Sequence, residues 1–214
     1  AIVNFPLALL LTRGVVVVIA STVHELAHAL VATLLGDPTP RERGRLTLNP
    51  LPHLESIGVI TGLLIGLGWS RPTPYHPHKT RLPIWLSGTL IGLAGPLASF
   101  GLAVLCAIPF RRGWLSPDWP WGGWPQPVHF LTVMMTFNAT LALLNLLPLF
   151  PLDGFRLVLY WLPLRPAALW QRASGWTTAM LGVPLFLLLM LPPRLFEGLL
   201  DPLARWLLRL LLVT

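Results

Sequence analysis

The chain has 214 residues, of which 54% are hydrophobic and only 11% are charged, whereas about 25% of the residues of soluble domains are charged. This composition excludes an ordinary soluble domain and predicts a membrane protein with the length of one domain. The formal net charge of +7 comes almost entirely from arginines in short loops. There they set membrane topology and meet anionic lipid, so we expect no nucleic-acid partner.

The apolar segments predict an all-α integral membrane protein, built as a polytopic helical bundle. Residues 1–12 are too short to span a bilayer alone, so they are either the end of a longer helix or an interfacial lead-in. The first two full spans cover residues 15–35 and 84–110. Between them, residues 45–48 alternate as a short strand does, and residues 57–69 are apolar but too short to cross, which predicts a re-entrant segment.

The span at 84–110 is interrupted by Gly95-Pro96. Along it, small residues form a face on which another helix can approach closely: Gly88, Gly92, Ala94 and Gly95. Further spans are predicted at 128–147 and 176–191. In the tail, residues 194–214, charged side chains recur every four residues, which predicts an interfacial amphipathic helix.

The first span contains the run His24-Glu25-Leu26-Ala27-His28, an H-E-x-x-H motif. Residues four apart share one face of a helix, so both histidines can direct their imidazoles to a common point, which Glu25 flanks. Two neutral imidazoles suit Zn²⁺, and a carboxylate that is not a ligand can act as the general base of a metalloprotease. The alternative is a pair of helix histidines satisfied by hydrogen bonds. Ionisable groups are costly inside a membrane helix, and a shared metal explains all three.

Catalytic zinc usually has three protein ligands and an open fourth position. We assign the third ligand to Asp153, because it directly follows an apolar span and lies between helix-breaking prolines and a glycine. The alternative is Glu197 with Asp201, since E-x-x-x-D on a helix serves another class of membrane zinc peptidases. The charged stripe of the tail accounts for those two without a metal. The other acids have charged or turn-forming neighbours and are interpreted as solvated: Asp37, Glu42, Glu55 and Asp118.

Six motifs, in one order, carry a resemblance to a known family: HELAH at 24–28, GDP at 36–38, GRLTLNP at 44–50, GWSRP at 68–72, AGP at 94–96 and NLLPLFPLDG at 145–154. Over about residues 15–160 the chain resembles the site-2 proteases, intramembrane zinc metalloproteases, in the minimal branch without a PDZ or CBS domain. The resemblance implies one zinc ion per chain, a glutamate base and a polar asparagine near the scissile bond. The corresponding residues here are His24, His28 and Asp153 for the metal, Glu25 for the base, and Asn145.

Two positions depart from the family pattern. The family often has Asp where this chain has Glu55, after His53, and Asn where it has Ser99. Neither departure removes a ligand, and the sequence gives none of these three residues a role.

The sequence therefore predicts an intramembrane zinc endopeptidase, with residues 1–214 as a single membrane-embedded metalloprotease domain. Zinc would activate a water that Glu25 deprotonates, and zinc with Asn145 would stabilise the oxyanion. The expected partners are the lipid bilayer and a transmembrane protein or peptide substrate, whose helix must unwind before its peptide bond is accessible. Two other classes compete, a metal-binding membrane scaffold or transporter and a catalytically silent binding protein. Polar groups clustered at one depth disfavour the first, and an intact Glu25 disfavours the second.

Charge near the span ends predicts the orientation. If residues 57–69 do not cross, loops 36–83 and 151–175 share a side and hold most of the basic residues, namely Arg41, Arg43, Arg45, Arg71, Lys79, Arg81, Arg156, Arg165 and Arg172. The opposite loop holds only Arg111 and Arg112. The positive-inside rule then makes the first two loops cytoplasmic, in the plasma membrane, with the active site nearer that side.

Overall fold

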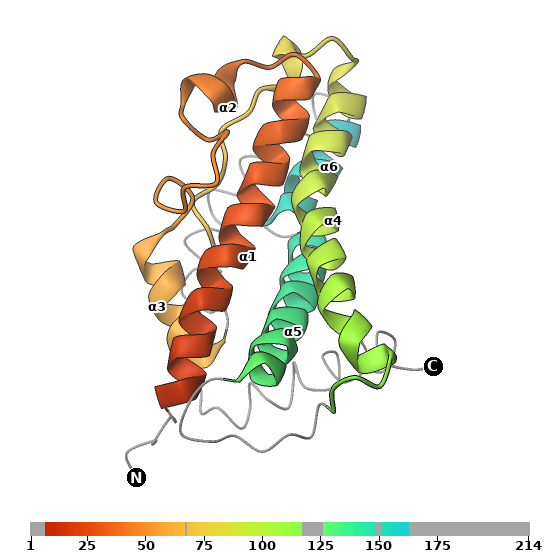
Figure 1. Ribbon diagram of the computed structural model, residues 1–214. Coiled ribbons are helices and arrows are strands. Elements are labelled where there is room, and N and C mark those ends of the chain that lie inside the picture. The colour runs from red at the N-terminus through yellow and green to blue at the C-terminus, as the bar shows by residue number, and fades with distance from the viewer. Residues whose placement is uncertain (1–6, 67, 117–125, 149–150, 163–214) are drawn as a thin grey trace.

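In the computed structural model, residues 7–66, 68–116, 126–148 and 151–162 are described, and their regular elements are all helical (Figure 1). The elements are α1 (Leu7–Leu34), α2 (Thr39–Glu42), α3 (Ser56–Ile65), the 3-10 helix η1 (Pro77–Lys79), α4 (Ile84–Arg111), α5 (Pro127–Leu146) and α6 (Asp153–Trp161). By length and composition, α1, α4 and α5 are long and apolar enough to cross a membrane. The all-α polytopic prediction is confirmed. The span predicted at 176–191 and the tail helix at 194–214 lie outside the described residues.

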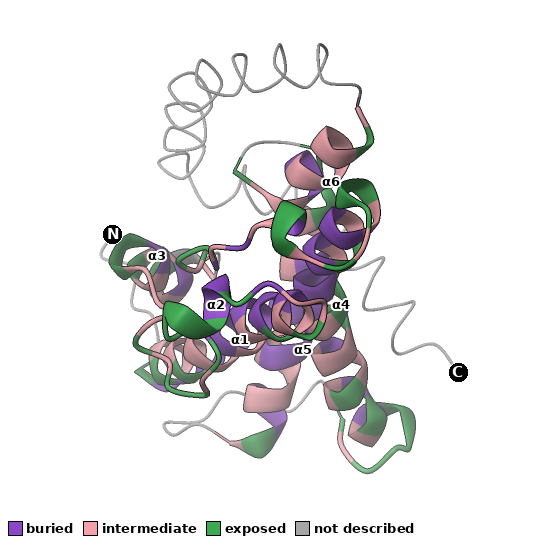
Figure 2. Ribbon diagram, turned by 90° about the horizontal axis from the view of Figure 1, so that it is seen from above, coloured by how far each residue is buried: buried purple, intermediate pink, exposed green. Residues whose placement is uncertain are grey.

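The three long helices pack against one another, and α6 lies against α4 (Figure 1). Between α4 and α5 the buried side chains are mostly alanines: Ala103, Ala107 and Ala139, with Met135. Small side chains let helix backbones approach closely, which favours helix association where lipid provides no hydrophobic driving force. Seen from above, buried residues concentrate where α1, α4 and α5 meet (Figure 2).

Two helices are longer than the sequence pattern indicates. Helix α1 continues through Arg13 and Gly14, so residues 7–12 are the end of a longer helix, one of the two expected alternatives. Helix α4 continues through Gly95 and Pro96, so the predicted interruption was wrong. A proline removes one N–H and crowds the preceding turn, but packing against α1, α5 and α6 holds α4 in one piece.

The segment 36–83, between the first two spans, enters and leaves at the same end of the bundle. The N–H of Arg81 donates to the carbonyl of Leu35 at 2.9 Å, which joins the two ends of the segment. Between them, α3 packs along α1 and ends beside Arg13, whose Nη1 donates to the Leu64 carbonyl at 3.0 Å. The segment therefore turns back without crossing, as predicted.

The short strand predicted at 45–48 was wrong, since the described residues contain no strand. Side-chain turns take its place: Thr47 Oγ1 accepts from the N–H of Asn49 at 3.0 Å, and Asn49 Oδ1 accepts from the N–H of Leu51 at 3.1 Å. An extended segment needs a paired neighbour to become a strand. The pairing that does form is one isolated antiparallel bridge, between Leu54 and Ser70.

Candidate metal centre

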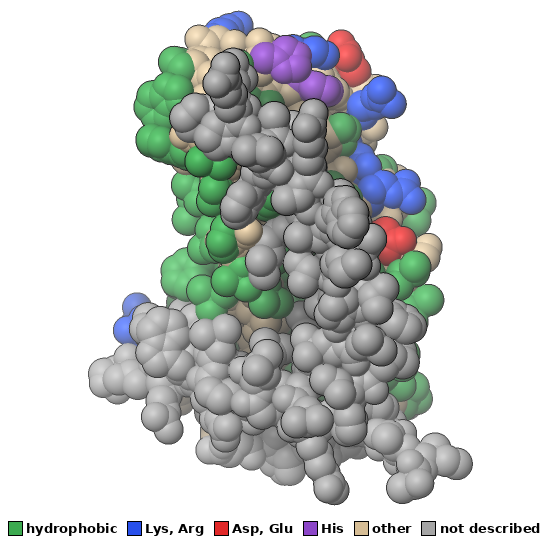
Figure 3. All heavy atoms as spheres, turned by 180° about the vertical axis from the view of Figure 1, so that it is seen from behind, with side chains coloured by type: hydrophobic (Ala, Val, Ile, Leu, Met, Phe, Trp, Pro, Cys, Tyr) green, Lys and Arg blue, Asp and Glu red, His purple; other side chains and the backbone are tan. Residues whose placement is uncertain are grey.

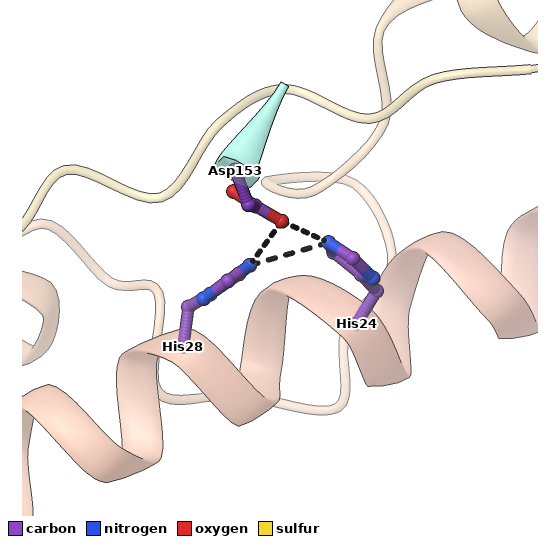
Figure 4. Close-up of side chains that lie close together, drawn as sticks. All are labelled: His24, His28 and Asp153. Carbon is purple, nitrogen blue, oxygen red and sulfur yellow. Dashed lines mark hydrogen bonds and ion pairs between the residues drawn. The ribbon is translucent and has the colours of Figure 1, made fainter. Parts of the chain in front are cut away.

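Three side chains from two helices converge at the centre of the bundle. Nε2 of His24 and Nε2 of His28, on α1, each lie 3.1 Å from Oδ2 of Asp153, on α6 (Figure 4). The two Nε2 atoms lie 3.2 Å apart. Both histidines are 2% exposed, and the Asp153 side chain is 15% exposed. The structure thus brings together the three residues that the sequence analysis assigned to the metal.

Hydrogen bonds on the far side of each imidazole fix its orientation. Nδ1 of His28 lies 2.7 Å from the carbonyl oxygen of Ile91, which can only accept, so Nδ1 carries the proton. The other ring nitrogen, Nε2, is then the one with a free lone pair in the neutral ring. Nδ1 of His24 forms a 2.9 Å hydrogen bond with Oγ of Ser99. Both partners lie on α4, so this helix aims both imidazoles at Asp153.

Helix α4 can support the histidines because Gly95 has no side chain. A Cβ at this position would collide with Nε2 of His28 and lie 2.6 Å from Nε2 of His24. The sequence analysis expected a close helix approach on this face of α4. At Gly88 and Gly92 the approaching atoms belong to Tyr160 and Leu157 of α6, and at Gly95 they belong to the two imidazoles. The contact with the imidazoles therefore explains why the AGP motif at 94–96 has a glycine at its centre.

Asp153 is the first residue of α6, after an extended Leu152. The helix that begins here therefore includes Asp153 itself. Its neighbour Gly154 lets the start of α6 lie on the end of α5, since a Cβ there would collide with the carbonyl oxygens of Leu146 and Leu147. The corner between α5 and α6 thus sets the position of the carboxylate.

The donor set fits a zinc ion. With Nδ1 of both imidazoles protonated, the two Nε2 atoms and the ionised carboxylate present lone pairs to one another at 3.1–3.2 Å, and one bound cation satisfies all three. Ligands bound tetrahedrally to zinc at about 2.0–2.1 Å lie roughly 3.3 Å from one another, close to the observed spacing. Among the described residues three ligand atoms converge here, the number of protein ligands that catalytic zinc sites usually have.

The Glu25 carboxylate hydrogen-bonds with the loop at residues 70–73. Its Oε1 accepts a hydrogen bond from Oγ of Ser70 at 2.6 Å, and its Oε2 accepts one from the N–H of Thr73 at 2.6 Å. The carboxylate is 5% exposed and is not among the three converging ligand atoms. This arrangement agrees with a base that is not itself a ligand.

Asn145 lies in the last turn of α5, where its Nδ2 donates to the carbonyl of Leu141, on the same helix, at 2.9 Å. Its expected role near the scissile bond therefore stays a prediction. The rival ligands Glu197 and Asp201 lie outside the described residues, as does Asp118.

The interpretation of Asp37 as a solvated acid was wrong, because its side chain is completely buried. Its Oδ1 accepts from the N–H of Thr39 at 3.0 Å and its Oδ2 from the N–H of His76 at 2.5 Å. Burial would raise the pKa of the Asp37 carboxyl, but these hydrogen bonds hold the pKa below its ordinary value. Asp37 therefore ties the end of α1 to the loop before η1.

Glu55 and His53 also have structural partners. Glu55 caps α3, its Oε2 accepting from the N–H of Gly58 at 2.9 Å. His53 is completely buried, and its Nε2 hydrogen-bonds with the carbonyl of Thr47 at 3.0 Å.

Sequence reasoning missed the partners of the motif residues: Ser99 behind His24, and Ser70 and Thr73 around Glu25. For Ser99 a signal was present, because it follows Gly95 by four residues and therefore shares its helix face. For Ser70 and Thr73 there was none, since which segment of an irregular loop reaches a buried helix depends on the tertiary fold.

Comparison with known proteins agrees with this site. "Putative zinc metalloprotease YwhC" of Bacillus subtilis is 38% identical over 158 residues, which are 72% of this chain and 70% of the relative. "Putative zinc metalloprotease Rip2" of Mycolicibacterium smegmatis is 33% identical over 142 residues, 62% of this chain and 50% of Rip2, so the chain spans half of that relative. No protein-family model and no solved structure matches.

A buried His-His-Asp cluster within a bundle of membrane-length helices, next to a buried glutamate, defines the class of membrane zinc metalloproteases. The relatives place the chain within that class. It belongs to the site-2 protease family.

Proposed function

We propose that this protein is an intramembrane zinc endopeptidase that hydrolyses a peptide bond within or near the transmembrane segments of membrane-protein substrates, as in regulated intramembrane proteolysis. The observation that carries the proposal is the burial of His24, Glu25 and His28 within α1, a helix long and apolar enough to span a membrane. Ionisable groups at such a depth are costly and mark functional sites.

The chain's residues divide the chemistry among them. His24, His28 and Asp153 would hold one zinc ion per chain, which when bound supplies Lewis-acid chemistry, lowering the pKa of a water and polarising a carbonyl. Glu25 accepts the proton of the attacking water and returns it to the leaving amine. Asn145 would have to exchange its hydrogen bond with Leu141 to reach the substrate oxyanion.

The substrate class follows from the surroundings of the site. Because the ligands lie inside a helical bundle, a transmembrane helix is the substrate that can reach them from the bilayer. A helix hides its peptide bonds in its own hydrogen bonds, so the substrate must unwind locally before cleavage. Glycine or proline near the scissile bond should therefore speed cleavage.

The test separates the base from the ligands. Glu25→Gln keeps the size of the side chain and all three ligands, so zinc should stay near one per chain while cleavage falls at least about 10²-fold. Asp153→Ala removes a ligand and should lose both zinc and activity, as should His24→Ala and His28→Ala. Zinc is measured by elemental analysis, and cleavage with a purified reporter that carries one transmembrane helix interrupted by Gly-Pro.

Each competing interpretation predicts a different result. Full zinc occupancy in Asp153→Ala would place the third ligand elsewhere, for example at Glu197. Unimpaired cleavage by Glu25→Gln would end the mechanism. A wild-type protein that binds zinc but cleaves no reporter would favour a metal-binding scaffold or transporter.

We also propose that loop 36–83 is cytoplasmic, in the plasma membrane, with the site nearer that side. The support is the gathering of Lys, Arg and His side chains at this end of the molecule (Figure 3). After Cys106→Ala removes the single cysteine, Thr80→Cys and Ser116→Cys should react with an impermeant thiol reagent from opposite sides. Labelling of both from one side would contradict this orientation.

A further inference from the structure

The loop that contacts Glu25 holds both its side chain and its backbone. Besides the two bonds to the carboxylate oxygens, Oγ1 of Thr73 donates to the Glu25 carbonyl oxygen at 3.1 Å. Thr73 is 2% exposed and Glu25 5%, so the two bonds between these residues are shielded from water. Three hydrogen bonds from a four-residue stretch, Ser70 to Thr73, therefore converge on one glutamate.

The sequence of the stretch limits which backbone group can donate a hydrogen bond to Glu25. Thr73 stands between Pro72 and Pro74, and proline has a fixed φ and no backbone N–H. The N–H of Thr73 is thus the single backbone donor of this tripeptide, and it is directed to Oε2 of Glu25. Because prolines limit the conformations of the unfolded loop, ordering it costs less entropy.

The stretch is itself anchored on its N-terminal side. Nη1 of the buried Arg45 donates to the carbonyl of Arg71 at 3.0 Å. The N–H of Arg71 donates to the carbonyl of His53 at 2.8 Å, beside the bridge between Leu54 and Ser70. A stretch fixed in this way can fix the carboxylate that it contacts.

We propose that the Ser70 hydroxyl and the Thr73 N–H are positioning groups for the general base, holding the Glu25 carboxylate in one rotamer. This inference rests on the proposed function. A glutamate side chain has several rotatable bonds, and a general base must lie within hydrogen-bond reach of the proton that it takes. An ionised carboxylate offers about four lone-pair sites. The loop occupies two of them, and the others remain for the attacking water.

A purely structural role makes a different prediction. If these bonds only attached the loop to α1, their loss would lower stability, zinc content or substrate binding. If they position the base, their loss lowers kcat and leaves zinc content and KM in place, because the interaction matters in the transition state.

The experiment uses the full-length protein with the Gly-Pro transmembrane reporter and measures kcat, KM and bound zinc. Ser70→Ala should lower kcat about 10–100-fold, as loss of a supporting hydrogen bond does, with zinc and KM within about twofold of wild type. Ser70→Thr keeps the hydroxyl and should recover most of the loss. Thr73→Val keeps the N–H and should have a small effect, whereas Thr73→Pro removes the N–H and should lower kcat as Ser70→Ala does.

The control is Ser87→Ala, which removes a buried hydroxyl on α4 whose bonds go to the carbonyls of Pro83 and Pro77. It should leave kcat unchanged. Wild-type or raised kcat in Ser70→Ala would overturn the inference, as would a loss of zinc or a raised KM that accounts for the whole effect. Failure of the proposed function looks different, since the wild-type protein itself would then fail to cleave the reporter.

Discussion

The two faces of one turn of α1 are built by different means. The face with His24 and His28 meets other helices, and its geometry depends on how closely α4 and α6 approach, which Gly95 and Gly154 permit. The face with Glu25 meets an irregular loop, and its geometry depends on hydrogen bonds from Ser70 and Thr73. The candidate ligands are thus placed by helix packing together with hydrogen bonds to α4, and the glutamate by hydrogen bonds from a loop.

This difference predicts how each face responds to change. Packed helices have no room for extra atoms, so an added methyl group must displace a backbone or a ligand. Hydrogen bonds can be removed one at a time, each with a moderate effect. Substitutions on the metal-binding face should therefore have larger effects than those in the loop that supports the base.

The largest effect is expected from Gly95→Ala. The new Cβ would overlap Nε2 of His28 and press on Nε2 of His24, so α4 or the imidazoles must move. We expect zinc affinity to fall by about 100-fold, the upper end of what a disturbed ligand environment costs, with activity falling accordingly. Competition with a zinc chelator measures the affinity.

Gly101→Ala, on the same helix, is the matched control. A Cβ there meets nothing within 4 Å, and both substitutions change helix propensity by the same amount, about 1 kcal/mol. Gly101→Ala should bind zinc like the wild type. Equal zinc affinity in the two variants would contradict the placement of the ligands by helix packing.

A smaller effect is expected from Ser99→Ala, which removes the hydrogen bond behind His24 but adds no atoms. Loss of a partner that orients a histidine ligand costs about tenfold in metal affinity. The same chelator competition should show this loss, while Ser87→Ala keeps full affinity. If Ser99→Ala impaired substrate cleavage alone, with zinc affinity intact, the residue would act on the substrate instead.

The smallest effect on the metal is expected from Asp37→Asn, in the region that anchors the loop. Asp37 has a pKa below its ordinary value in the folded protein, so it stabilises the fold above that ordinary value, about 3.9. The stabilisation is lost as the pH falls through the lower folded-state pKa. At neutral pH we expect a loss of about 2 kcal/mol, seen as a lower Tm in detergent, with zinc still bound.

The difference in Tm between wild type and Asp37→Asn should shrink as the pH is lowered below about 4. The exposed Glu42, in the same loop, provides the control, since Glu42→Gln should leave Tm unchanged. A difference in Tm for Asp37→Asn that persists in acid would assign its effect to packing.

The sequence was sufficient to single out the three side chains that converge in the structure as candidate ligands, because each carries a local signal. The two histidines are four residues apart on an apolar helix, and Asp153 is an acid beside a broken span. The sequence was insufficient where the outcome depended on partners distant along the chain. The alternation at 45–48 lacked a partner strand, and Asp37 accepts a hydrogen bond from the N–H of His76, 39 residues away. Ser70 reaches Glu25 across 45 residues, a distance over which no periodic pattern extends.

Arg13 links α1 and α3 through complementary needs. An arginine within a membrane helix is costly to insert, and α3 by itself would leave the carbonyls of its last turn without donors. In the folded protein the guanidinium of Arg13 donates to two of those carbonyls, on Leu63 and Leu64. Each element therefore supplies what the other lacks: α3 offers the Arg13 guanidinium acceptors in place of water, and α1 offers the last turn of α3 donors that a bilayer does not provide.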